Sequence, residues 1–366
     1  MRRLLISVAI MAGLSGCAVG PDYVRPTVDT PETWRIELPQ AAAVANLPWW
    51  EQFGDPVLSQ LIETALRENL DAAIAAARIE QFVGQLATTR AQFYPQLGYS
   101  ADASRNRASQ AGQPPLAPGA DLYSSLYQGA LSAQWQIDLF GRVRRQSEAA
   151  QAQVYASEQG RRGVILTVAT SVAASYINLR ALDRQLDISR ATAKNFAGTR
   201  EIFELRFKGG VVSQVEMSQV ESQYQQALAA IPALEQQIAA QENLLSLLLG
   251  RNPGPIPRGR AIDQLVAPDI PGDLPSSLLE RRPDILQAEQ TLVAANANIG
   301  VAKSLYYPSL SLTGVLGSVS TAFSDFLSGS AAAWSVTGGL TGPLFTFGAI
   351  EGQVQTAEAF QREALA

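Results

Sequence analysis

The stretch YQGALSAQWQID, residues 127–138, alternates apolar and polar side chains over its whole length. On an extended chain, Leu131 and Trp135 would point to one face, while Gln134 and Gln136 would point to the other. Strict alternation over about ten residues, with one apolar and one polar face, is typical of a β-strand that has lipid on one side and a polar lumen on the other. This stretch therefore predicts transmembrane β-structure.

Three further segments show the same alternation, and together the four predict two hairpins, over residues 93–140 and 306–347. The polar side of each segment carries Ser, Thr, Gln and Gly with almost no Lys or Glu, which favours a lumen. The alternative is a half-buried strand of a soluble sheet, because such a strand shows the same period. The residues that we expect to face lipid are Leu97, Tyr99, Leu131, Trp135, Leu310, Leu312, Trp334 and Val336.

Most of the remaining sequence is rich in Ala, Gln, Leu, Glu and Arg, a composition that predicts long helices. We expect helices over residues 56–92, 142–208, 213–249 and 276–306. The second of these would be roughly 100 Å long at 1.5 Å per residue. Beyond residue 16 we find no run of about 18 apolar residues, so we expect no membrane-spanning helix. The expected fold class is mixed α and transmembrane β.

The chain contains an internal duplication. The string FYPQL at 93–97 matches YYPSL at 306–310, and each repeat reads as helix, strand, loop, strand and the start of a long helix. We expect an extended segment at 17–55 and a first repeat at 56–275, with a helical hairpin at 142–249 and a connector at 250–275. The second repeat, 276–366, ends soon after Gly348, the counterpart of Gly141, so we expect a C-terminally truncated chain.

The first residues have the pattern of a secretory signal. Arg2 and Arg3 precede an apolar run at 4–14 that is too short to span a bilayer. Small residues follow, and the Leu-Ser-Gly-Cys string that ends at Cys17 resembles the lipobox of bacterial lipoproteins. This predicts a signal peptide at 1–16 and a lipid on Cys17, and Ala18 favours sorting to the outer membrane. The alternative is a plain signal with an incidental cysteine.

Composition argues against several classes of protein. The chain has no histidine, so the commonest general base and imidazole metal ligands are lacking. Its single cysteine cannot build a thiolate zinc site. The net charge is −5 without a basic block, which gives nucleic-acid binding no electrostatic support. We therefore expect no catalytic residues, no metal site, no cofactor and no nucleic-acid partner.

Two hairpins cannot close a pore. An open sheet edge cannot face lipid, because each of its unpaired N–H and C=O groups would cost several kcal/mol. Closure must therefore come from other copies of the chain, and two, three or four copies would give a barrel of 8, 12 or 16 strands.

Many short strings along the chain are similar to those of one family, the TolC/OprM-like (NodT-type) outer-membrane factors of tripartite efflux pumps. They include CAVGPDY at 17–23, YPQL at 94–97, IDLFGR at 137–142, LERRPDI at 279–285 and PLF at 343–345. The resemblance implies a homotrimer with a 12-stranded barrel and a periplasmic α-helical tunnel, lipid-anchored in the outer membrane of a Gram-negative bacterium. It also implies a passive exit duct that docks to a periplasmic adaptor and to an inner-membrane pump of the resistance-nodulation-division type.

The same resemblance assigns the turn after the longest helix to adaptor docking, at the periplasmic tip of the tunnel. An ordinary helical hairpin with a solvated glutamate is the alternative. The residues assigned to this tip are Arg206, Phe207, Gly209, Gly210, Ser213 and Glu216.

Two functional hypotheses follow. The first is an outer-membrane channel that lets drugs or other small toxic compounds leave through an efflux system. The second is a non-conducting, membrane-anchored periplasmic scaffold or a truncated inactive copy. The transported compounds, the adaptor and the pump cannot be identified from the sequence.

Overall fold

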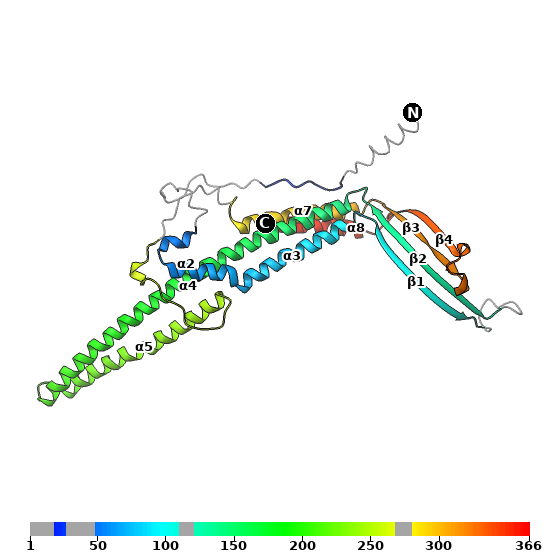
Figure 1. Ribbon diagram of the computed structural model, residues 1–366. Coiled ribbons are helices and arrows are strands. Elements are labelled where there is room, and N and C mark those ends of the chain that lie inside the picture. The colour runs from blue at the N-terminus through cyan, green and yellow to red at the C-terminus, as the bar shows by residue number, and fades with distance from the viewer. Residues whose placement is uncertain (1–17, 27–47, 110–120, 268–279) are drawn as a thin grey trace. The chain divides into compact units, whose positions relative to one another are not determined.

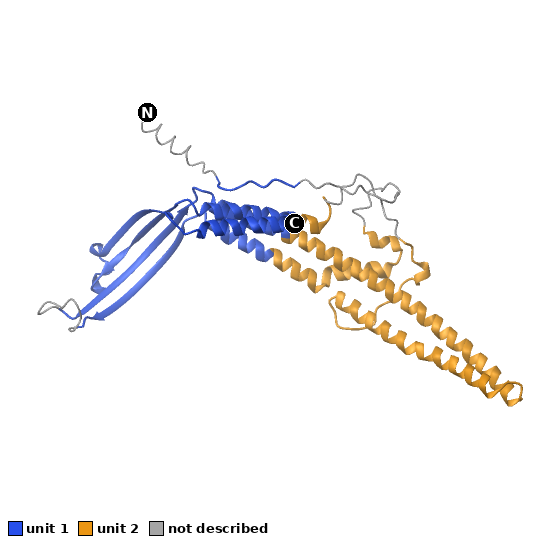
Figure 2. Ribbon diagram, turned by 180° about the vertical axis from the view of Figure 1, so that it is seen from behind, with its two compact units in different colours: residues 1–27, 80–156, 287–366 blue, residues 28–79, 157–286 orange. Residues whose placement is uncertain are grey.

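A computed structural model describes residues 18–26, 48–109, 121–267 and 280–366. The expected signal peptide at 1–16 and Cys17 lie outside the described residues. The chain divides into two compact units (Figure 2). Unit 1 comprises residues 1–27, 80–156 and 287–366, and unit 2 comprises residues 28–79 and 157–286.

Unit 1 contains a four-stranded antiparallel sheet with the order β1-β2-β3-β4 (Figure 1). All four expected strands are present, and the two hairpins lie side by side because β2 pairs with β3. The outer edges of β1 and β4 have no partner strand among the described residues. The strands are β1 (Gln96–Arg107), β2 (Tyr123–Ile137), β3 (Ser309–Ser320) and β4 (Ala332–Thr341), with the short helices η4 (Phe323–Asp325) and η5 (Gly329–Ala331) between β3 and β4.

Helices at the base of the sheet complete unit 1. They are α7 (Pro283–Ser304), α8 (Ala349–Leu365), the end of α3 (Leu70–Ala91) and the start of α4 (Arg142–Lys208). Ala149 and Ala152 of α4 pack against Ala294 and Ala297 of α7 in a buried cluster. Side chains this small let the two helix backbones approach closely.

Unit 2 is a helical unit with its own apolar core. Its remaining elements are η2 (Trp49–Phe53), α2 (Pro56–Glu68), α5 (Gln214–Leu248) and η3 (Ile262–Gln264). The core is formed where α2 and the C-terminal part of α5 pack on the middle of α4, and the connector adds Ile256. Its fully buried large side chains include Leu58, Ile62, Val172, Tyr176, Leu179, Leu245 and Leu249.

The expected single helix over 56–92 is in fact two helices, because the chain breaks at Asn69. Asn69 has an extended backbone (ψ 131°), and its side chain donates to the Leu248 carbonyl at 2.8 Å and accepts from the Ala72 amide at 3.0 Å. Its own amide still bonds to the Ala65 carbonyl. One residue thus ends α2, caps α3 and ties both to the end of α5, a role that helix propensity does not reveal.

The expected bounds of the other helices can be compared with the structure. α4 matches its expected bounds, 142–208. The helix expected to start at residue 276 is α7, which begins at Pro283; residues 276–279 lie outside the described part of the chain. One helix, α4, contains a stretch long and apolar enough to cross a membrane by length and composition alone, which the search for a run of about 18 apolar residues did not identify. Val168, Val172 and Leu179 of α4 are buried in the unit 2 core, and this packing accounts for part of the apolar composition.

A buried hydrogen-bond network fastens the connector to this core. The Tyr176 hydroxyl donates to the Asp55 carboxylate at 2.9 Å and accepts from the Gly259 amide at 2.8 Å. Asp55 is 1% exposed and also accepts from the amides of Val57 and Arg260. Burial, together with the neighbouring Asp55, raises the pKa of Tyr176 to about 12, so the hydroxyl keeps its proton at neutral pH.

We expect Tyr176→Phe to loosen the connector. The substitution leaves the buried Asp55 carboxylate and the partly buried Gly259 amide without one partner each, at a cost of about 1–3 kcal/mol. Amide hydrogen exchange at Gly259 and Arg260 should accelerate about tenfold. Tyr155→Phe is the matched control, because Tyr155 lies on the same helix and is 48% exposed. Equal exchange in the two variants would contradict the role given to the hydroxyl.

Candidate functional site

The strand register places all eight residues expected to face lipid on one face of the sheet. Directly paired residues of antiparallel strands lie on the same face. One row across all four strands is Tyr99, Leu131, Leu316 and Trp334, and a second pairs Trp135 with Leu312. The other three members belong to the same face: Leu97 pairs with Ala133, and Val336 pairs with Gly314. Leu310 pairs with Ile137 on one side and with Leu340 on the other. We call this surface the apolar face.

Large side chains on the apolar face are exposed in the single chain. Tyr99 is 87% exposed, Trp334 76% and Leu131 63%. Trp135 is only half-buried, near the base of the sheet, where its indole N–H donates to the Phe93 carbonyl at 2.9 Å. A continuous apolar surface across four strands is unusual for a water-soluble monomer and marks an interaction or membrane surface.

The opposite face of the sheet is largely polar. It carries hydroxyl and amide side chains, and its few hydrogen bonds are local, such as that from Gln128 to Asp102 at 3.4 Å. Some apolar residues, including Val315 and Val319, share this face. Its polar members in the register are Gln96, Ser100, Asp102, Ser104, Asn106, Ser124, Gln128, Ser132, Gln134, Gln136, Ser309, Ser311, Thr313, Ser335, Thr337 and Thr341.

The second candidate site is the turn between α4 and α5, in unit 2. The last turn of α4 carries Arg206 and Phe207, and the chain reverses at Gly209 and Gly210. Gly210 has φ +72°, a left-handed conformation that a glycine adopts at little cost. The Val211 amide then bonds back to the Arg206 carbonyl at 2.9 Å, which satisfies the end of the helix.

Ser213 and Glu216 form a capping box that starts α5. The Ser213 hydroxyl accepts from the Glu216 amide at 3.3 Å, and the Glu216 carboxylate accepts from the Ser213 amide at 2.6 Å. The hydrogen bonds with Ser213 lower the pKa of Glu216, so its charge persists in mildly acidic solution. The Glu216 carboxylate, which the resemblance assigns to the tip, thus has a local structural role as well.

The turn brings together the six residues predicted for the tip, of which Phe207 is 39% exposed. It also exposes apolar side chains that were not among the predicted tip residues: Val211 and Val215 are 75% and 76% exposed, and Leu205 is 65% exposed. A pattern of large apolar residues next to the two glycines could have identified them. Two ion pairs, Arg190 with Glu235 and Arg200 with Glu221, join α4 to α5 behind the turn.

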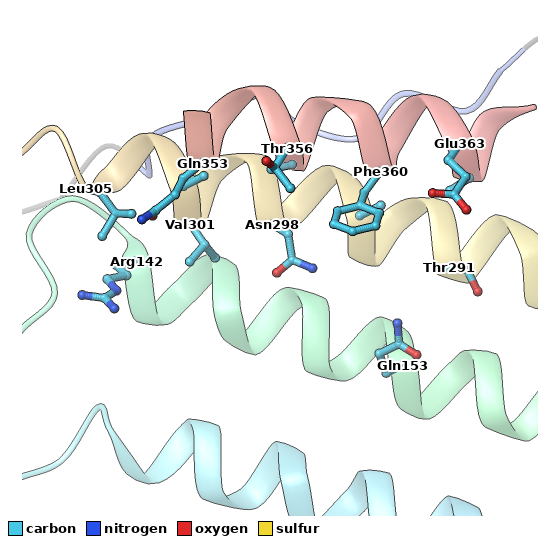
Figure 3. A pocket seen from close by; sticks show the side chains of 14 residues that line it. Arg142, Gln153, Thr291, Asn298, Val301, Leu305, Gln353, Thr356, Phe360 and Glu363 are labelled. Atoms are coloured by element: carbon cyan, nitrogen blue, oxygen red, sulfur yellow. The ribbon is translucent and has the colours of Figure 1, made fainter. Parts of the chain in front are cut away.

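Sequence reasoning also missed an open groove of about 800 Å³ in unit 1, between the start of α4, α7 and α8 (Figure 3). Val301 and Phe360 give it apolar walls, with Asn298, Arg142 and Glu363 as polar groups along its length. Across the described ranges, no three His, Cys, Asp or Glu side chains are grouped so that they could hold a metal ion. The groove contains no arrangement that suggests catalysis.

The family model and the relatives that match this sequence are all outer-membrane proteins. The family model for outer membrane efflux proteins matches residues 61–251 and 274–366. The probable outer membrane lipoprotein SilC of Salmonella typhimurium is 29% identical over 99% of this chain and 78% of its own length. The toluene efflux pump outer membrane protein TtgC of Pseudomonas putida is 31% identical over 96% of this chain and 74% of its own.

The solved structures that resemble this chain include outer-membrane channels. The outer-membrane channel OprN superposes with a TM-score of 0.84 at 28% identity, covering 95% of this chain and 78% of that one. The open state of the Neisseria gonorrhoeae MtrE outer membrane channel gives a TM-score of 0.80 at 28% identity, over 95% and 77% of the two chains. These are channels rather than enzymes. With its two repeats of helix and hairpin and its sheet of two unlike faces, the chain belongs to the outer membrane efflux protein family.

Proposed function

We propose that this protein is the outer-membrane channel component of a tripartite efflux system, and that it forms a passive exit duct for drugs or other small toxic compounds. One observation carries the proposal: large apolar side chains lie on one face of all four strands, with Arg105 and Arg107 only at the loop end of that face, while the opposite face is mostly polar and nearly uncharged. This division suits a strand layer with lipid outside and water inside.

Closure of the barrel by other copies is the next part of the proposal. The free edges of β1 and β4 expose backbone N–H and C=O groups, which cannot remain unpaired in hydrocarbon. Three copies, each giving four strands, would make a closed barrel of 12 strands. The proposed homotrimer would meet this requirement, and the similarity to the outer-membrane channel OprN supports a channel.

We further propose that a lipid on Cys17 anchors the chain, with the helices on the periplasmic side of the outer membrane. The apolar run and the Leu-Ser-Gly-Cys string support this part of the proposal, as does the similarity to SilC, which is named an outer membrane lipoprotein. Mass spectrometry of the mature N-terminus would find a diacylglyceryl thioether on Cys17, whereas an unmodified cysteine would refute the anchor.

At the turn between α4 and α5, we propose docking of a periplasmic adaptor that links the channel to an inner-membrane pump. Exposed apolar side chains on a turn fixed by a capping box offer a preformed surface, which loses little conformational entropy on binding. Arg206, Phe207, Gly209, Gly210, Ser213 and Glu216 would then shape this surface, with Val211 as an apolar contact.

The two faces of the sheet can be tested with adjacent residues on the central strand β2. Leu131→Arg would put a charge in lipid at a cost of about 2–4 kcal/mol, so we expect the inserted, heat-modifiable form to be lost on electrophoresis. Ser132→Arg, one residue further on the opposite face, should insert and conduct, with selectivity shifted towards anions in single-channel recordings. Equal insertion of both variants would contradict the assignment of the two faces, whereas a wild-type chain that neither inserts nor conducts would support the scaffold.

For the tip, we expect Val211→Asp to abolish efflux-dependent drug resistance while single-channel conductance stays unchanged. The charge would disrupt an apolar docking contact without touching the barrel. Val266→Asp is the matched control, since Val266 is 57% exposed on the connector. If the susceptibility of cells carrying Val211→Asp matches that of cells carrying the control, the turn does not dock the adaptor.

A further inference from the structure

Residues 18–25, which we call the strap, lie along α4 and α7 of unit 1 and are held at nearly every residue (Figure 1). The Val19 amide donates to the Phe140 carbonyl at 3.2 Å. Asn296 of α7, which is 9% exposed, donates from its side chain to the Pro21 carbonyl at 3.0 Å. Glu289 of α7 accepts from the Tyr23 hydroxyl at 3.3 Å and pairs with Arg25 at 3.0 Å.

Arg145 of α4 is the main partner of the strap. Its guanidinium donates to the carbonyls of Val19 at 3.2 Å and Gly20 at 3.3 Å, and it reaches the Asp22 carboxylate at 2.7 Å. A fourth contact, to Glu148 at 2.8 Å, fixes the guanidinium from its own helix. The side chain is only 7% exposed, and only the planar fork of an arginine can serve these acceptors together.

Glycines bring the strap into backbone contact with the unit. Gly20 has φ +105°, and a Cβ there would lie 2.4 Å from the Cα of Gly300 on α7. Gly141, between β2 and α4, has φ +75°, and a Cβ there would lie 2.7 Å from the Cα of Ala18. The strap therefore fits in one register, because a shift by one residue would bring the side chain of Val19 or Pro21 against the backbone of Gly300 in place of Gly20.

This register determines where a lipid on Cys17 would begin. Cys17 is bonded to Ala18, so the two Cα atoms are about 3.8 Å apart. Ala18 lies against Gly141, at the base of β2, which leaves no flexible spacer between the lipidation site and the sheet. Resting on the lipid anchor proposed above, we infer that the strap is a dock which holds the acyl chains beside the base of the sheet, with Arg145, Gly20 and Gly300 as its positioning residues.

The dock couples two insertion events. With the anchor held at the sheet, the acyl chains and the apolar face enter the bilayer from the same side, and the sheet is kept at the membrane surface until its edges pair. Without the dock, the lipid would still be attached, but the sheet could drift away from the bilayer by the length of the freed strap.

Gly20→Ala in the full-length, lipidated chain tests the dock, because the substitution lies in the strap and leaves the folded unit intact. We would follow chymotrypsin cleavage after Tyr23 in detergent, by mass spectrometry of the released peptide 17–23. Cleavage tracks the fraction of undocked strap, so its rate should rise at least about tenfold. Gly163→Ala is the control, since a Cβ at Gly163 would meet no atom within 4 Å.

Arg145→Ala should accelerate cleavage similarly, and Arg145→Lys should restore protection only in part. Asp22→Ala should have a smaller effect, below about threefold, because the Asp22 side chain is 90% exposed. Arg161→Ala, which replaces an exposed arginine of the same helix, should leave the cleavage rate unchanged.

A second measurement follows insertion into the outer membrane. For Gly20→Ala and Arg145→Ala, we expect the amount of heat-modifiable protein in the outer membrane to fall while Cys17 stays acylated.

Unchanged cleavage in Gly20→Ala would overturn the dock. Faster cleavage with normal membrane insertion would overturn the positioning role of the strap. An unmodified Cys17 in the wild-type chain would refute the proposed anchor and with it the inference, whereas the detergent assay would still report whether residues 18–25 bind Arg145. A failure of the lipid anchor on Cys17 can therefore be distinguished from a failure of the docking of residues 18–25.

Discussion

An open sheet edge cannot be left in a bilayer, and this constraint governs the rest of the molecule. Each strand of the sheet has one apolar and one mostly polar face, so the sheet suits a boundary between lipid and water. Within the described ranges, the outer edges of β1 and β4 nevertheless have no partner strand, so each presents a row of unpaired backbone groups. Water can form hydrogen bonds with those groups, whereas hydrocarbon cannot. A sheet placed in the membrane with its apolar face towards lipid is therefore stable only if other copies of the chain pair with its edges.

Much of this fold could be predicted from the sequence, because a period of two is a strong signal when one face of a strand is apolar and the other polar. Leu131 and Trp135 identified their strand and its orientation, and the match of 93–97 with 306–310 identified the second hairpin. The register was not predictable, since alternation within one strand does not say which residue of the next strand lies opposite. The pairing of β2 with β3 came only from the structure.

Tertiary contacts explain what sequence reasoning missed. Asn69 breaks a helix-favouring run because the end of α5 offers its side chain an acceptor. Arg145 could not be distinguished from the surface arginines around it, since its partners lie more than 120 residues away in the chain. At the turn after α4, the glycines and the capping box were readable, but the exposure of Val211 and Val215 depends on how the two helices pack.

The copy number of the folded protein tests the central claim most directly. Native mass spectrometry of protein extracted from the outer membrane in mild detergent would report a complex of three chains if β1 and β4 close a barrel between copies. A single folded chain that stays in solution without detergent, with its apolar face covered by its own residues, would contradict the account.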